Sequence, residues 1–79
     1  MNGGIIFKIG DRVRCVNDYV NQYLKGKIGK VIEIQDWIGV EFSEEFPQGH
    51  DCSGKGKPNR CWRLPRENLI LLKKEIWDN

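Results

Sequence analysis

The residues with the most evident chemistry are His50 and Cys52, which lie two positions apart, and Cys61 further along the chain. Structural zinc takes four Cys or His ligands, commonly in closely spaced pairs. Here a fourth ligand would have to be Cys15 or Asp51. The residue types leave three possibilities open: a metal site at His50, Cys52 and Cys61, a disulfide between Cys52 and Cys61, or free thiols. We expect no cofactor and no metal, with Cys15 buried and with Cys52 and Cys61 close together because they bracket one loop.

Two further patterns fall short of known catalytic or phosphate-binding motifs. Cys52 and His50 would share one face of an extended chain, but no oxyanion hole or orienting third group accompanies them. We expect the His50 ring to hydrogen-bond the surrounding loop instead. Gly54-Lys55-Gly56-Lys57 matches only a fragment of the Gly-x4-Gly-Lys-Ser/Thr phosphate loop. The sequence therefore predicts a protein that is not an enzyme.

The chain has 79 residues, of which 39% are hydrophobic and 30% charged. This length and composition predict one small globular domain over 1–79, with a core of about 7–72 and a C-terminal tail at 73–79. A domain of this size has a thin core and little shelter for a deep catalytic cleft. The sequence shows no apolar run of membrane-spanning length, no secretory signal pattern and an odd number of cysteines. We therefore expect a cytoplasmic protein with reduced thiols and no membrane partner.

Alternating polar and apolar residues predict an all-β domain with strands near 11–16, 28–35, 37–43, 61–65 and 69–72. The order of strands and loops is that of a single small five-stranded Src-homology-3-like barrel. A long loop joins the third and fourth strands, and at residues 43–60 it exceeds the length of about 12 to 15 residues usual for loops without a function. The predicted core residues are Val13, Val31, Ile38, Val40, Phe42, Trp62, Leu64 and Leu69.

Two segments carry a resemblance to known proteins. Residues 7–34 contain a Gly-Asp turn, a strand and then Lys25-Gly26-Lys27-Ile28-Gly29 before the next strand. This segment resembles the KOW motif of ribosomal and transcription-elongation proteins, which implies a small barrel and contact with nucleic acid. Downstream, Gly49-His50-Asp51-Cys52-Ser53-Gly54 followed by Cys61-Trp62 resembles small uncharacterised bacterial and phage proteins that share a Gly-His-x-Cys-x-Gly loop. The second resemblance implies no activity.

The net charge is only +2, but the charges are unevenly distributed. Acidic residues dominate 41–51 and basic residues dominate 52–66. We expect a binding module for single-stranded nucleic acid or RNA, because basic and aromatic side chains together bind unpaired strands. An interaction module for another protein, or an adaptor in a larger assembly, is the alternative. The candidate phosphate contacts are Lys25, Lys27, Lys30, Lys55, Lys57, Arg60 and Arg63, and the candidate base-stacking residues are Tyr19, Tyr23 and Trp37.

Overall fold

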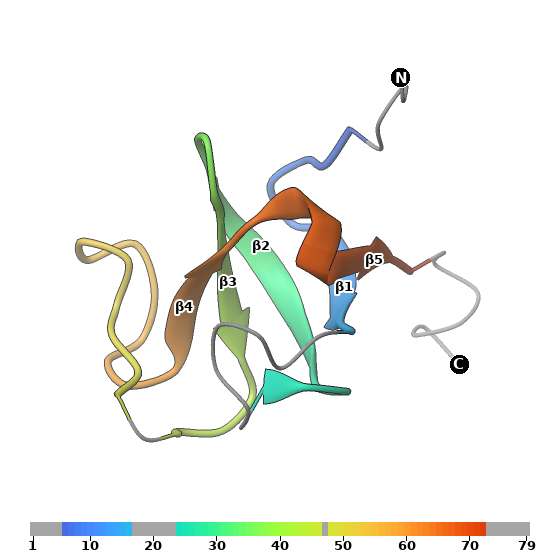
Figure 1. The fold of residues 1–79 in the computed structure, drawn as a ribbon. Coiled ribbons are helices and arrows are strands. Elements are labelled where there is room, and N and C mark those ends of the chain that lie inside the picture. The colour runs from blue at the N-terminus through green and yellow to red at the C-terminus, as the bar shows by residue number, and fades with distance from the viewer. Residues whose placement is uncertain (1–5, 17–23, 47, 73–79) are drawn as a thin grey trace.

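A computed structural model describes residues 6–16, 24–46 and 48–72 of the chain. Within these residues five antiparallel strands form one sheet (Figure 1). The strands are β1 (Arg12–Cys15), β2 (Ile28–Ile34), β3 (Ile38–Phe42), β4 (Cys61–Leu64) and β5 (Leu69–Leu71). The predicted all-β class and all five predicted strands are therefore confirmed.

The strands are ordered β4-β3-β2-β1-β5 in the sheet. β2 and β3 form a hairpin, as the turn residues Gln35-Asp36 between the two β-branched runs predict. β4 is joined to β5 by the one-turn 3₁₀ helix η2 (Arg66–Asn68). Asn68 N–H donates to the Pro65 carbonyl at 3.0 Å, which closes the tight turn that a proline and an asparagine at these positions predict. No pairing between β4 and β5 occurs in the described part of the chain, so barrel closure stays a prediction. No described helix is long and apolar enough to span a bilayer.

One face of the sheet carries the core, because alternate residues of a strand point to the same side. Seven of the eight predicted core residues are buried there, and Trp62 is half-buried against them. Val40 and Trp62 are cross-strand partners on this face, as are Ile38 and Leu64. The Trp62 ring packs on Phe46 instead of entering the interior, with ring centroids 6.1 Å apart.

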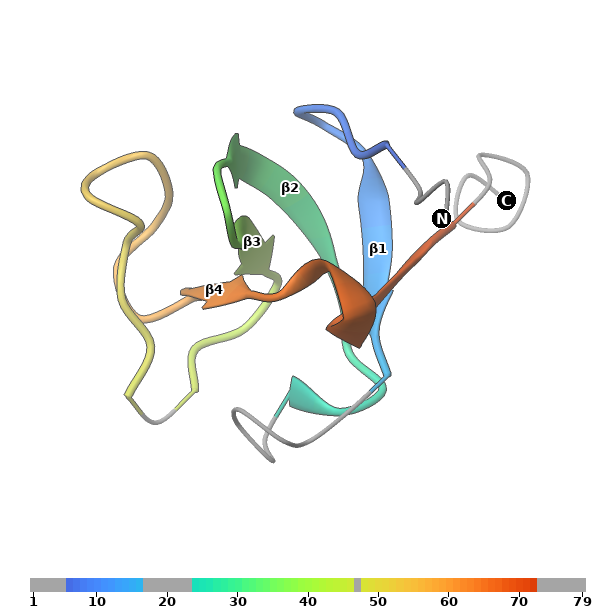
Figure 2. The same cartoon turned by 45° about the horizontal axis from the view of Figure 1, so that its top comes forward.

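The long loop at 43–60 lies beside β4, on the side away from β1 and β5 (Figures 1 and 2). It begins in the core, because Phe46 is buried and packs edge-on against Phe42 at 5.7 Å. His50 then forms a backbone bridge with Cys61 of β4, through two hydrogen bonds of 3.0 and 2.9 Å. The loop is therefore attached to the edge of the sheet before it turns over the opposite face. The sequence also predicts a loop over residues 17–26, because polar and aromatic residues mix there without strand alternation, and most of this segment falls outside the described residues.

Candidate functional site on the outer face of the sheet

The face of the sheet opposite the core, here called the outer face, owes its chemistry to one bulge in β2. Val31 pairs with Val40, but Glu33 pairs with Gly39, so Ile32 is an extra residue in the ladder. Such a bulge shifts the alternation by one position. Glu33 consequently lies on the outer face, in one cross-strand row with Gly39 of β3 and Arg63 of β4.

Glu33 and Arg63 form an ion pair across Gly39. Arg63 Nε donates to Glu33 Oε1 at 2.6 Å, and a second bond runs from Arg63 Nη2 to Glu33 Oε2 at 3.4 Å. Gly39 permits this contact because a Cβ there would lie 2.8 Å from the Glu33 Cβ. Glu33 is only 4% exposed, yet hydrogen bonding from Arg63 outweighs burial and lowers its pKa.

The loop covers this ion pair and is fastened to it. Arg63 Nη2 also donates to the Ser53 hydroxyl at 3.0 Å, and the Lys57 backbone N–H donates to Glu41 Oε2 at 2.8 Å. Around the first of these attachments, three consecutive residues, Cys52, Ser53 and Gly54, have positive φ angles of 52°, 60° and 88°. Two of them are not glycine, a conformation that costs free energy and persists only where its surroundings hold it.

The thiols of Cys52 and Cys61 meet beneath this loop. Both residues are fully buried, both thiols are free, and each thiol lies close enough to the other to influence its pKa. Cys61 Sγ also contacts the Lys57 carbonyl at 3.4 Å. Desolvation raises the pKa of Cys52, and desolvation together with the neighbouring Cys52 raises the pKa of Cys61 to about 12. The predicted approach of these two cysteines is confirmed, as is the predicted burial of Cys15.

His50 takes part in packing and in loop structure. Its Nδ1 accepts a hydrogen bond of 3.0 Å from the Cys52 backbone N–H, and its ring lies 5.4 Å from the Trp62 ring. This confirms that the ring hydrogen-bonds its own loop. Within the described residues, no three His, Cys, Asp or Glu side chains are gathered to hold a metal ion. The alternative ligand set of His50, Cys52 and Cys61 is therefore not assembled as a metal site.

The outer face of β1 and β2 is basic. Arg12 and Arg14 alternate along β1 with buried Val13 and Cys15, and Arg12 is the cross-strand partner of Lys30. Arg12 and Arg14 were not among the predicted site residues. The Arg-Val-Arg-Cys alternation was the signal that could have identified them, because it places both arginines on the side opposite the core.

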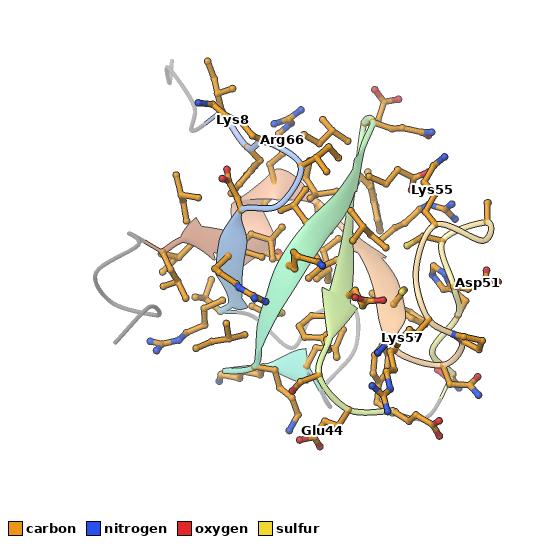
Figure 3. All side chains as sticks on the ribbon, turned by 180° about the vertical axis from the view of Figure 1, so that it is seen from behind. Lys8, Glu44, Asp51, Lys55, Lys57 and Arg66 are labelled. Atoms are coloured by element: carbon orange, nitrogen blue, oxygen red, sulfur yellow. The ribbon has the colours of Figure 1, made fainter. Side chains whose placement is uncertain are left out.

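Glu41 connects this basic surface to the loop. It is the cross-strand partner of Lys30, and its carboxylate accepts the Lys57 backbone N–H. Lys30 and the backbone of Lys57, which belong to two different groups of predicted phosphate contacts, therefore both adjoin Glu41. In Figure 3, Lys57 lies in the half of the molecule that contains Glu44, whereas Lys55 lies in the opposite half.

The remaining predicted phosphate contacts are dispersed. Lys25 and Lys55 are exposed, and Arg60 is half-buried where the loop rejoins β4. Lys27 Nζ lies 3.7 Å from Glu44 Oε1, and Arg63 forms an ion pair with buried Glu33. A phosphate would therefore compete with a carboxylate for each of these two cations. The structure consequently brings together Lys30 and the Lys57 segment, and adds Arg12 and Arg14 beside them.

Among the described residues, no contact brings a predicted base-stacking side chain onto the basic outer face of β1 and β2. Trp37 lies in the β2–β3 turn and is 47% exposed. Tyr19 and Tyr23 lie outside the described residues. Apolar side chains instead border the basic surface, because Ile28 and Ile70 are the partners of Arg14 on either side and are 40% and 47% exposed.

Comparisons with protein families, with curated proteins and with solved structures found no match to this chain. The function is therefore argued from the residues of the outer face alone.

Proposed function

We propose that this chain is a non-catalytic binding module that holds single-stranded nucleic acid or RNA on the outer face of β1 and β2. The observation that carries the proposal is the register of these strands, which puts Arg12, Arg14 and Lys30 on neighbouring positions of one face. Adjacent cations on a sheet can follow successive phosphates of a strand.

The proposed path of the nucleic-acid strand extends from this surface to the loop at 43–60. Lys30 and Lys57 both adjoin Glu41, one through strand pairing and the other through its backbone N–H. The Glu41 carboxylate accepts the Lys57 backbone N–H and is an acidic group set among the cations Arg12, Arg14 and Lys30 of the proposed surface. A backbone of phosphates lying over β1, β2 and the loop would meet a net positive surface.

The architecture is part of the same proposal. The strand order β4-β3-β2-β1-β5 and the 3₁₀ turn before β5 are compatible with a small Src-homology-3-like barrel of the KOW type. This family is the source of the nucleic-acid expectation. Its support here is strand order and the motif at residues 7–34, and fold alone assigns no function.

A second candidate function rests on Ile28 and Ile70. These exposed aliphatic side chains flank Arg14 in one cross-strand row. An arginine bordered by apolar surface is also typical of protein interfaces. The alternative is a protein partner that presents an acidic group between apolar side chains.

The salt dependence of oligonucleotide binding distinguishes the two functions. We expect the purified protein to bind a mixed-sequence single-stranded oligonucleotide at about 50 mM salt and to lose affinity linearly in log salt concentration. Fluorescence anisotropy with a labelled oligonucleotide measures this directly. Absence of binding at about 50 mM salt would leave the protein-interaction function as the better account.

A further inference from the structure

Beneath the loop, the structure brings together two thiols that the proposed function does not use. Cys52 and Cys61 are both fully buried on the outer face of the sheet. The Cys52 sulfur lies against Gly39 of β3, and Cys61 is the cross-strand partner of Glu41, two residues further along the same strand. Cys15, the third cysteine, is separated from them because it belongs to the core face. We propose that Cys52 and Cys61 form a reversible dithiol–disulfide site that fastens the loop to β4 when it is oxidised.

The packing around the sulfurs favours a disulfide over a bound metal ion. A Cβ at Gly39 would lie 3.1 Å from the Cys52 sulfur, and a Cβ at Gly56 would collide with the Cys61 sulfur. The two glycines thus leave room for the sulfur atoms themselves. Forming an S–S bond removes two hydrogens and draws the sulfurs together, whereas a metal ion would need additional space and further ligands. His50 Nδ1 is already occupied by the Cys52 N–H.

The oxidant that suits this site is a small disulfide such as glutathione disulfide. The Cys52 thiolate attacks one sulfur of glutathione disulfide, which forms a mixed disulfide and releases one glutathione thiolate. The Cys61 thiolate then attacks the Cys52 sulfur, which forms the internal disulfide and releases the second glutathione. Two protein thiols are oxidised, one glutathione disulfide is reduced to two glutathione molecules, and the two thiol protons pass to the released thiolates.

The roles of the two cysteines follow from their surroundings. Burial and the charge of Glu33 raise the pKa of Cys52, whereas the charge of Arg63 opposes them and favours the thiolate. Cys61 is held as a thiol more firmly, because burial raises its pKa to about 12. Cys52 is therefore the attacking thiol, and Cys61 is the thiol that resolves the mixed disulfide.

The loop controls access to both sulfurs. Oxidation requires the loop to open, which breaks the bond from Arg63 to Ser53 and the bond from the Lys57 N–H to Glu41. The positive φ angles at Cys52 and Ser53 lower the cost of opening, because that backbone strain is released. We expect oxidation in the folded protein to be slower than in the unfolded chain, at a rate set by loop opening.

The test uses the full chain incubated with excess glutathione disulfide, followed by intact-mass measurement, peptide mapping and thermal melting. The expected product has lost two hydrogen atoms, links Cys52 to Cys61, keeps an alkylatable Cys15 and melts at least about 5 °C higher than the reduced form. Dithiothreitol should restore the reduced mass and melting temperature. A stable glutathione adduct on Cys52, a cross-link to Cys15, persistent free thiols or a lower melting temperature would each overturn the proposal.

Two sets of variants separate chemistry from folding. Cys61→Ser should retain a glutathione adduct on Cys52 because no resolving thiol remains. Ser53→Ala removes the hydrogen bond to Arg63 and should speed oxidation about three- to tenfold through more frequent opening. Ser43→Ala, at an exposed serine outside the thiol site, is the matched control and should oxidise at the parent rate. Equal rates for the two serine variants would contradict control of access by the loop.

Discussion

Glu33 and Arg63, thirty positions apart in sequence, meet on the outer face with Arg63 Nε 2.6 Å from Glu33 Oε1. They meet because the bulge at Ile32 turns Glu33 outward and because Gly39 between them has no side chain. Arg63 in turn bonds Ser53 of the loop. One ion pair therefore joins β2, β4 and the loop, which makes it the structural centre of the outer face.

Acid should weaken the fold in part through Glu33. Its pKa in the folded protein lies below the ordinary value of 4.5, so its contribution to stability is present above about pH 4.5 and is lost as pH falls through the folded pKa. Glu33→Gln should therefore be less stable than the parent at pH 7, and the difference should narrow below pH 4.5. Urea unfolding across pH 3 to 7, or about that range, measures the difference.

Glu44→Gln is the matched control for this titration. Glu44 is exposed and lies 3.7 Å from Lys27, so its loss should change stability little at any pH. A Glu33→Gln deficit that stays constant or grows in acid would contradict the assigned role of the ion pair.

Gly39→Ala should strain the outer face. The added Cβ would lie 2.8 Å from the Glu33 Cβ and 3.1 Å from the Cys52 sulfur. We expect a loss of about 1–3 kcal/mol in the free energy of unfolding. We also expect faster alkylation of Cys52, with Cys15 in the core as the internal control. Unchanged stability together with unchanged Cys52 labelling would show that the sheet accommodates the methyl group.

The core residues should respond as their burial requires. Val40 and Leu64 are both fully buried, and truncating either to alanine should cost about 2–4 kcal/mol. Ile70→Ala on the exposed side of β5 is the control, with an expected cost below about 1 kcal/mol. Chemical denaturation measures all three, and equal midpoints would disprove the assignment of faces.

Trp37 tests whether an aromatic side chain adds to strand binding. The ring is 47% exposed in the β2–β3 turn. If it stacks on a base, Trp37→Leu should lower oligonucleotide affinity about 5- to 100-fold while leaving the salt slope unchanged, because stacking involves no counterion release. An unchanged affinity in the anisotropy titration would remove Trp37 from the binding surface.

The sequence predicted the strands well because their alternation is strong and their ends are marked by turns. Val13 and Cys15 in β1 and the run from Ile38 to Phe42 are unambiguous. The same alternation predicts Trp62 for the core side, but β4 is an edge strand of the sheet, where the ring packs on Phe46 and stays half-buried. Alternation gives the side of the sheet and leaves the depth of burial undetermined.

The outer face was harder to predict, because it depends on register and on loop docking. Ile32 looks like its β-branched neighbours, so the sequence does not mark it as an extra residue, and Glu33 reads as an ordinary strand position. Arg63 was consequently predicted to contact phosphate, although it is paired with Glu33. The approach of Cys52 and Cys61 could be predicted, since both bracket one loop.

The central claim is that nucleic acid binds the basic outer face, and the most direct test compares two double variants in the oligonucleotide titration. Arg14→Gln with Lys30→Gln removes two neighbouring cations of that face. Lys8→Gln with Arg66→Gln removes the same charge outside β1 and β2, since Lys8 precedes β1 and Arg66 belongs to η2. The account predicts weaker binding by the first pair and a salt slope flatter by about 1.4, which is about 0.7 for each lost phosphate contact. The control pair should keep the parent slope. Equal slopes and affinities for the two double variants would contradict the claim.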